Sequence, residues 1–317
     1  MRLLRTPDFS TDPDYSGCIA TIGNFDGVHA GHRAIISRVI EQAKAQGLKA
    51  TVISFEPLPT EFFCGQFERK LPLRIYPFRD KLRLLADLAI DHYLSLKFSP
   101  QLCDIEPDDF IHDVLIKKLN VRHLIVGDDF RFGKDRKGDY ALLQKIGKAH
   151  GMTIEDSITT RVATNRVSST RIREALSTGD IQSANTLLTQ PYQLSGRVVH
   201  GDKRGRTIGF PTLNLRLPDN IAAAKGVYAV KVHQRNDKSY YGVANLGTRP
   251  TVGGDKIHLE THIFDFDKDI YGRCVGIELV KYMRPEQKFA DFNLLMAQIK
   301  KDAEQARVLF GIEMKLP

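Results

Sequence analysis

The sequence predicts an α/β domain built on a parallel sheet, followed by a small antiparallel β-barrel domain that ends in a C-terminal helix. In the first half, short β-rich runs alternate with helical patterns, and beyond about residue 190 strand candidates follow one another directly. A last amphipathic stretch closes the chain. A length of 317 residues favours two domains. We place the boundary near residue 187, which gives domains 1–187 and 188–317.

The first half has the β-α-β-α rhythm of a parallel sheet covered on both faces. Strands are predicted over residues 18–22, 49–55, 92–96 and 123–126, and helices over 32–46, 79–89, 107–119 and 139–150. In the first of these helices, Ile36, Val39 and Ile40 share one face. Pro107 stands in the first turn of its helix, where proline is tolerated. Ligands of such a sheet bind at the carboxyl ends of the strands.

The second half reads as consecutive antiparallel strands. They are predicted over residues 192–199, 226–232, 240–245, 257–266 and 274–280, with turn clusters such as 235–238 between them. Many short strands in a small region favour a closed barrel, because closure removes exposed edges. The last helix is predicted over about 291–309, with Asp291 as its N-cap and Gly311 as its stop.

Composition narrows the class of protein. Hydrophobic residues make up 42% and charged residues 26%, as in ordinary soluble domains, and no apolar run approaches the roughly 18 residues that span a bilayer. The start of the chain does not resemble a signal peptide. Cysteines stand at positions 18, 64, 103 and 274 with no C-x-x-C pair, which favours a reducing cytoplasm over a zinc or disulfide framework.

The net charge of +8 has two interpretations. Nucleic-acid binding is one, but no recognition helix, zinc knuckle or aromatic RNA-binding strand is visible. Basic residues that serve polyphosphate ligands are the interpretation we prefer. We therefore expect no nucleic-acid partner and no membrane partner, and the sequence leaves a homo-oligomer open.

The first motif is GNFDGVHAGH (residues 23–32), answered downstream by VSSTRIR (residues 167–173). A strand ends at the first glycine and a helix begins near Gly31, so unpaired helix N–H groups offer an anion site. His29 and His32 are three residues apart and can meet one phosphate group. In the partner motif, the hydroxyl residues 168–170 precede Arg171 and Arg173. The planar guanidinium groups of these arginines can bind phosphate oxygens through two hydrogen bonds. This chemistry fits adenylyl transfer, which needs positioned donors rather than covalent catalysis.

The second motif is GDKRGRTIGFPTLN (residues 201–214), answered by Glu260. Its glycines and cations predict a basic loop that closes over a polyphosphate. The Thr212 hydroxyl and the Asn214 amide oxygen point to the same side of a strand and are hard ligands that suit Mg²⁺. Glu260 is a candidate general base for an alcohol that attacks a γ-phosphate.

The first motif pair resembles the nucleotidylyltransferase superfamily, and specifically the FMN adenylyltransferase module of bacterial bifunctional FAD synthetases. The resemblance extends through SFEPLP (residues 54–59), EFF (61–63) and GDDFRFG (127–133). It implies a Rossmann-like domain in which these later segments line the flavin side of the site. The family often has a polar residue where this chain has Leu58, and often Asn where it has Asp129, so an Asp129 contact would use an acceptor only.

The second motif, together with LETHIFDFDKDIYG (residues 259–272), resembles riboflavin kinase, whose signature is P-T-x-N with a downstream catalytic Glu. The resemblance implies a six-stranded barrel, an ATP site under the glycine-rich loop and a flavin site near Glu260 and Met283-Arg284-Pro285. Leu213 replaces the usual Ala of the signature, a change that affects packing and not ligation.

Together the two resemblances imply a bifunctional enzyme that phosphorylates riboflavin to FMN with MgATP and then adenylylates FMN to FAD with release of pyrophosphate. The residues implied are, for catalysis, Glu260, His29, His32 and Arg171; for nucleotide binding, Gly23, Phe25, Asp26, Gly31, Ser168, Ser169, Thr170, Gly201, Lys203, Gly205 and Arg206, with Arg204 beside them; for flavin binding, Phe55, Pro57, Asp129 and Arg284; and for metal, Thr212 and Asn214.

Two alternatives remain open at this stage. One is a single-activity nucleotidylyltransferase whose barrel merely binds a flavin or another acceptor. The other is a basic RNA-binding or flavin-storage protein, although storage requires neither a base nor a metal.

Overall fold

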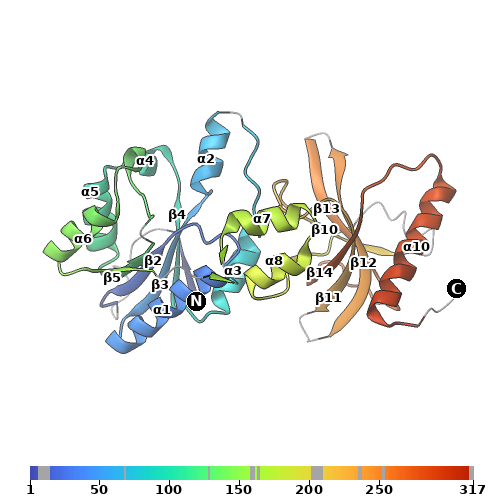
Figure 1. Ribbon diagram of the computed structural model, residues 1–317, viewed down its shortest axis with the longest axis horizontal. Coiled ribbons are helices and arrows are strands. Elements are labelled where there is room, and N and C mark those ends of the chain that lie inside the picture. Colours follow the sequence, from blue (N-terminus) through green and yellow to red (C-terminus); the bar gives the residue numbers. More distant parts are fainter. Residues whose placement is uncertain are drawn as a thin grey trace. The chain divides into compact units, whose positions relative to one another are not determined.

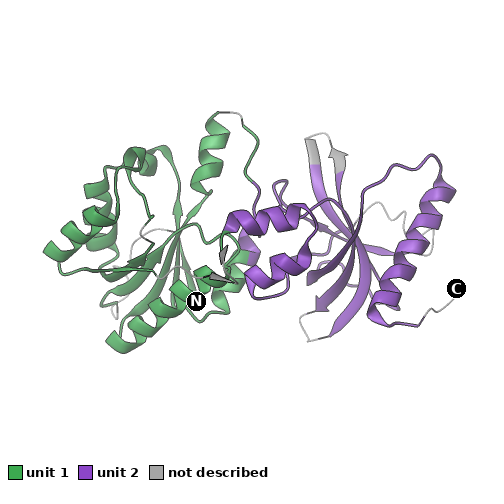
Figure 2. Cartoon of the chain, viewed as in Figure 1, with its two compact units in different colours: residues 1–72, 81–168 green, residues 73–80, 169–317 purple. Residues whose placement is uncertain are grey.

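The computed structural model describes residues 1–5, 15–67, 69–127, 129–157, 161–162, 165–200, 210–234, 238–251 and 254–313. The chain forms two compact units (Figure 2). Unit 1 comprises residues 1–72 and 81–168, and unit 2 comprises residues 73–80 and 169–317. The units divide between residues 168 and 169, whereas the domain boundary that we expect near residue 187 stays a prediction. The α/β domain and the following barrel with its C-terminal helix are confirmed.

Unit 1 contains one sheet of six parallel strands in the order β1-β4-β3-β2-β5-β6 (Figure 1). The strands are β1 (Arg2–Leu4), β2 (Cys18–Ile22), β3 (Lys49–Glu56), β4 (His92–Lys97), β5 (Val121–Val126) and β6 (Thr153–Asp156). From β2 the chain adds strands first on one side and then, with β5, on the other. The carboxyl ends of β2 and β5 therefore form the topological switch point, where open α/β sheets bind ligands.

The helices of this region are short except for the first. They are α1 (Ala30–Gln46), α2 (Pro59–Gln66), α3 (Phe78–Ala86), α4 (Pro100–Cys103), α5 (Pro107–Asp109), the π-helix η1 (Phe110–Lys118), the 3₁₀ turn η2 (Lys134–Arg136) and α6 (Tyr140–Ala149); a small ribbon joins β7 (Arg161–Val162) and β8 (Asn165–Arg166). The α-helix predicted over 107–119 is wrong beyond Asp109, where the chain forms a π-helix instead. In this helix the Leu119 amide donates to Val114 O, five residues back, at 3.1 Å. The helix predicted over 79–89 ends at Ala86, because Ala89 is in the left-handed region with φ 60°.

The two faces of the sheet bury alternate residues of β2. Cys18, Ala20 and Ile22 pack in a core that includes Phe110 of η1 and Leu143 of α6. Ile19 packs in a second core with α1. The period of two in the sequence therefore matches a strand that is covered on both sides.

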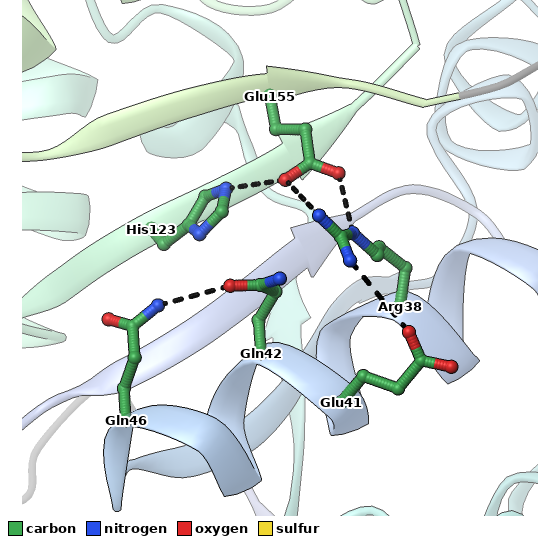
Figure 3. Close-up of polar contacts among 6 residues, drawn as sticks. All are labelled: Arg38, Glu41, Gln42, Gln46, His123 and Glu155. Carbon is green, nitrogen blue, oxygen red and sulfur yellow. Dashed lines mark hydrogen bonds and ion pairs between the residues drawn. The ribbon is translucent and has the colours of Figure 1, made fainter.

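A polar cluster links α1 to the sheet (Figure 3). Arg38 Nε donates to Glu155 Oε1 of β6 at 2.8 Å, and Glu155 Oε2 lies 3.1 Å from Nε2 of His123 on β5. Burial is the main cause that lowers the pKa of His123, and the Glu155 carboxylate opposes it. The Arg38–Glu155 pair is partly exposed, so solvent screens it and it adds little to stability.

Unit 2 is a six-stranded antiparallel barrel in the order β10-β13-β12-β11-β14-β9. The strands are β9 (Gln193–Arg197), β10 (Thr212–Arg216), β11 (Gly226–Gln234), β12 (Ser239–Thr251), β13 (Gly254–Ile263) and β14 (Cys274–Pro285). The amide of Val199 donates to Asn214 O at 2.9 Å, which connects the chain beyond β9 to β10 and closes the barrel. No range was predicted for β10, although the expectation that Thr212 and Asn214 point to the same side requires a strand at this place.

Among the described residues, α7 (Ser169–Ser177) and α8 (Ile181–Leu188) precede the barrel, and α10 (Phe292–Phe310) packs against β11 and β12 (Figure 1). The predicted ends of α10 are confirmed. The Asp291 side chain accepts from the Leu294 amide at 2.9 Å, and Gly311 is in the left-handed region with φ 64°.

Candidate active sites

The first motif forms the turn between β2 and α1, at the switch point of the sheet. The amide of Gly23 donates to Ile53 O of β3 at 3.0 Å, which continues the sheet into the motif. Phe25 and Val28 take left-handed backbone conformations with φ 48° and 44°, which non-glycine residues rarely adopt. Both of their side chains are buried, and so is Asp26. Tertiary packing thus fixes a strained turn directly before a helix N-terminus, a place where strain usually accompanies function.

His29 and His32 meet at this helix start, as the sequence predicts. Nδ1 of His29 accepts from the His32 amide at 3.3 Å and caps α1, and the two rings stack 3.6 Å apart. Since its Nδ1 accepts, a neutral His29 carries its proton on Nε2. Burial lowers the pKa of His32 well below the usual range, and the positive charges of His29 and Lys81 act in the same direction. The buried Nδ1 of His32 has no hydrogen-bond partner among the described residues.

Lys81, a residue that the sequence did not single out, lies behind this turn. Its side chain is 3% exposed, and Nζ donates to Asn24 O and Ser54 Oγ, both at 3.3 Å. A lysine in a helical pattern usually reads as a solvated residue, so nothing in the periodicity distinguished it.

An aromatic cavity of about 430 Å³ opens beyond the ends of β3, β4 and β5. The aromatic residues that line it are Phe55, Phe63, Phe98, Phe110, Phe130 and Phe132, and its charged residues are of both signs: Arg131, Lys134 and Arg136, with Asp104 and Asp135. The rings of Phe130 and Phe132 are nearly parallel, with centroids 5.5 Å apart. Such a slot suits a flat aromatic ligand.

Of the flavin-binding residues predicted for this unit, only Phe55 lines the cavity. Pro59 lines it in the part of the loop where we expected Pro57. Asp129 is exposed and is not among the lining residues. Phe98 contacts Phe55 and Phe63, but it has no counterpart in the motifs and was missed.

The partner motif spans the division between the units. Ser168 is the last residue of unit 1. Ser169, Thr170 and Arg171 form the first turn of α7 in unit 2, where helix N–H groups are not used by the helix itself.

In the barrel, three polar residues form a row across adjacent strands. Asn214 of β10 lies directly opposite Glu260 of β13, and Glu260 lies directly opposite Asn245 of β12. Directly opposite residues of antiparallel strands point to the same face, and so does Thr212, two residues before Asn214. The structure therefore brings the expected metal ligands and the expected base together, and it adds Asn245. The other expected residues of this motif, Gly201, Lys203, Arg204, Gly205 and Arg206, lie outside the described residues.

Thr212 lines two cavities. One, of about 420 Å³, is lined by residues that include Leu213, Thr261, Asp267 and Tyr271, and we call it the Tyr271 cavity. The other, of about 390 Å³, is lined by residues that include Asn245, Glu260, His262, Arg284, Phe289 and Asp302, and we call it the Glu260 cavity. Thr212, which stands two residues before Asn214, is therefore in reach of a ligand in either cavity.

His262 is a further residue of the Glu260 cavity that sequence reasoning missed. Its Nδ1 lies 3.0 Å from Pro211 O, and since a carbonyl only accepts, Nδ1 donates. Burial is the main cause that lowers the pKa of His262. His262 of β13 lies directly opposite Thr212 of β10, so its hydrogen bond fixes the backbone just before the first expected metal ligand.

Arg284 reaches the same cavity and is held in place by α10. Its Nε and Nη2 donate to the Asp302 carboxylate at 3.0 and 2.6 Å, and Gln298 Nε2 donates to the same group at 2.8 Å. The fork geometry fixes the guanidinium against the cavity wall.

Comparisons with known proteins match both parts of the chain. Residues 11–171 match the FAD synthetase family, and residues 188–310 match the riboflavin kinase family. The bifunctional riboflavin kinase/FMN adenylyltransferase of Escherichia coli K12 is 44% identical over 98% of this chain and 99% of its own length. The protein of the same description from Haemophilus influenzae Rd is 43% identical over 93% of this chain and 95% of its own.

Among solved structures, a protein from Streptococcus pneumoniae described as a macrolide-efflux protein superposes with a TM-score of 0.77. It is 29% identical in sequence, and the match covers 97% of this chain and 99% of that one. In the described part of this chain, no helix combines the length and the apolar character that crossing a bilayer requires.

Both expected modules are therefore present, in the expected order. The riboflavin kinase match over the barrel leaves no support for a single-activity enzyme with a passive flavin-binding barrel. The chain belongs to the family of bifunctional riboflavin kinases/FMN adenylyltransferases.

Proposed function

We propose that unit 2 phosphorylates riboflavin in the Glu260 cavity, with ATP in the Tyr271 cavity. The ribityl 5′-hydroxyl oxygen attacks the γ-phosphorus of ATP, its proton passes to the Glu260 carboxylate, and ADP leaves. Arg284 faces the flavin, and the polyphosphate contacts are assigned to Gly201, Lys203, Arg204, Gly205 and Arg206. The observation that carries this proposal is the row of Asn214 and Glu260 beside Thr212, a residue that lines both cavities.

Mg²⁺ fits the donors of this site. Asn214 is 3% exposed, and its Oδ1 has no hydrogen-bond partner among the described residues. A buried acceptor without a partner is costly unless a ligand satisfies it. We assign Asn214 Oδ1 and the Thr212 hydroxyl as the protein's ligands; the ion would complete its coordination with water and phosphate oxygens and would neutralise phosphate charge.

We further propose that the first motif adenylylates the FMN so formed. An FMN phosphate oxygen attacks the α-phosphorus of a second ATP, and pyrophosphate leaves. His29, His32 and Arg171 hold the triphosphate and stabilise the transition state, and the flavin ring occupies the aromatic cavity with Phe55. The nucleotide contacts are assigned to Gly23, Phe25, Asp26, Gly31, Ser168, Ser169 and Thr170.

We place the functional boundary near residue 187 and the protein in the cytoplasm. The family matches end at residue 171 and resume at 188, and all four cysteines are free thiols. The proposed partners are small molecules only: riboflavin, FMN and ATP.

One incubation tests the whole proposal. The pure protein is mixed with riboflavin, ATP and Mg²⁺, and the products are separated by chromatography over time. FMN with ADP should appear first, followed by FAD with pyrophosphate. The appearance of FMN without FAD would remove the second reaction, and the absence of both products would overturn the proposal.

A further inference from the structure

Lys81 is a buried cation that closes a small network behind the first motif. Its Nζ donates to Asn24 O and to Ser54 Oγ at 3.3 Å, and Ser54 Oγ donates to Asn24 O at 3.2 Å. The three groups form a closed triangle in which the Asn24 carbonyl accepts twice. The ammonium also lies 5.8 Å from the centre of the Tyr93 ring on β4.

The triangle holds the motif at its first bend. Asn24 is the second residue of the motif, and Ser54 belongs to β3, the neighbour of β2 in the sheet. The preceding residue, Gly23, is held by its own amide bond to Ile53 O at 3.0 Å. Lys81, from α3, therefore fixes the place where the chain leaves the sheet and enters the turn that ends at His29.

The charge of Lys81 also acts on the nucleotide site. An ammonium group is costly to bury, and an apolar side chain would fill the same space without that cost. The charge is felt by His32, whose pKa it lowers after the larger effects of burial and of His29. Phe25 also contacts the His32 ring, with centroids 5.1 Å apart, but it carries no charge.

We propose that Lys81 is a positioning residue for adenylyl transfer, which holds the Asn24 carbonyl and supplies positive potential behind the bound triphosphate. The proposal rests on the adenylyltransferase function proposed above for the first motif. It differs from a purely structural role, because a purely structural lysine would change stability without changing the affinity for ATP.

The test compares Lys81→Met with Arg79→Met in the full-length chain. Methionine keeps the length of the side chain and removes the charge and the donors, whereas Arg79 is an exposed cation of the same helix. In Lys81→Met, we expect kcat/KM for ATP in the conversion of FMN to FAD to fall about 10- to 100-fold, mainly through KM. Riboflavin phosphorylation by the same preparation should stay within twofold, and Arg79→Met should match the parent in both reactions.

A second measurement does not depend on turnover. The His32 imidazole is titrated by NMR in the ligand-free protein. Loss of the neighbouring cation should raise the pH at which His32 gains its proton in Lys81→Met and leave it unchanged in Arg79→Met. An unchanged titration together with an unchanged KM for ATP would overturn the proposal.

The outcomes separate this proposal from the one on which it rests. If the parent protein makes no FAD, the proposed function fails, while the His32 titration still shows whether Lys81 acts on the site. If Lys81→Met does not fold, Lys81→Gln replaces it, since glutamine removes the charge and keeps a donor. A severalfold rise in KM for ATP in Lys81→Gln supports the proposal, and a parental KM overturns it.

Discussion

Asn214 and Glu260 are cross-strand neighbours, directly opposite each other on β10 and β13, so the amide and the carboxylate point to the same face of the barrel. Asn214 is fully enclosed and Glu260 is half-buried at the edge of a cavity. A metal ligand and a proton acceptor are thus held by backbone pairing, and their spacing does not depend on a flexible loop.

Glu260→Gln should remove the proton acceptor with little change in shape. We expect kcat for riboflavin phosphorylation to fall by about 10²- to 10⁴-fold, the usual contribution of a general base. FAD formation from supplied FMN should stay at the parental rate, and the free energy of unfolding of unit 2 should match that of the parent, which is the control for folding. Equal loss of both activities would contradict separate sites.

Asn214→Ala should change the metal requirement of one reaction only. Without Oδ1 the site loses a protein ligand, so the Mg²⁺ concentration that gives half-maximal riboflavin phosphorylation should rise about tenfold or more. The Mg²⁺ dependence of FAD formation in the same preparation is the control. Coincident titrations of parent and variant in the kinase assay would exclude Asn214 from the metal site.

The sequence predicted those parts of the fold and site that depend on local periodicity and contiguous motifs. The strand 18–22 and the caps Asp291 and Gly311 are confirmed because alternation and capping are local signals. The His29–His32 pair could be predicted because residues three apart meet at a helix start.

The missed residues depend on contacts between distant segments. Lys81 meets Asn24, which is 57 residues away in the sequence, only in the folded chain, and Asn245 joins Glu260 only through the β12–β13 register. The π-helix after Asp109 was missed for a related reason. Its pattern of apolar residues resembles that of an α-helix, and only the hydrogen-bond register distinguishes the two.

The pH dependence of unit 2 should reflect His262. Its pKa in the folded protein is lowered from the ordinary 6.5, so the unfolded chain binds more protons as the pH falls below that value. His262 therefore contributes stability that is fully present above about pH 6.5 and is lost as the pH falls through the folded pKa. Urea unfolding at several pH values between 7.5 and 5 should show a decline that is shallower in His262→Gln. If the free energy of unfolding falls equally with pH in both proteins, His262 is excluded as a source of this pH dependence.

Two ion pairs of α10 provide a matched comparison. Asp302 is 5% exposed and binds Arg284, whereas Asp265 is 39% exposed and binds Arg307 through a similar fork. Asp302→Asn should lower the free energy of unfolding of unit 2 by about 2–4 kcal/mol, because it leaves Arg284 without its buried counter-charge. Asp265→Asn should cost about 1 kcal/mol or less, since solvent screens that pair.

The same comparison has a functional readout. Arg284 and Asp302 line the Glu260 cavity, so Asp302→Asn should also raise KM for riboflavin, and Asp265→Asn should not. Denaturant unfolding and kinase kinetics on both variants test the two effects. Equal losses of stability in the two variants would show that burial does not decide the strength of these pairs.

A substitution of Phe98 tests whether the aromatic cavity of unit 1 binds the flavin ring. This ring contacts Phe55, Phe62 and Phe63 at centroid distances of 5.3 to 5.9 Å, and it lines the cavity together with Phe55 and Phe63. Phe98→Leu keeps an apolar side chain but removes the aromatic face. If that face binds the flavin ring, KM for FMN in FAD formation should rise about 3- to 10-fold, as expected for the loss of one aromatic contact.

Phe67→Leu, at an exposed position that is not among the lining residues, is the control for a general effect of removing a phenyl ring. KM for riboflavin in the kinase reaction should not change in either variant, and a parental KM for FMN in Phe98→Leu would place the flavin elsewhere.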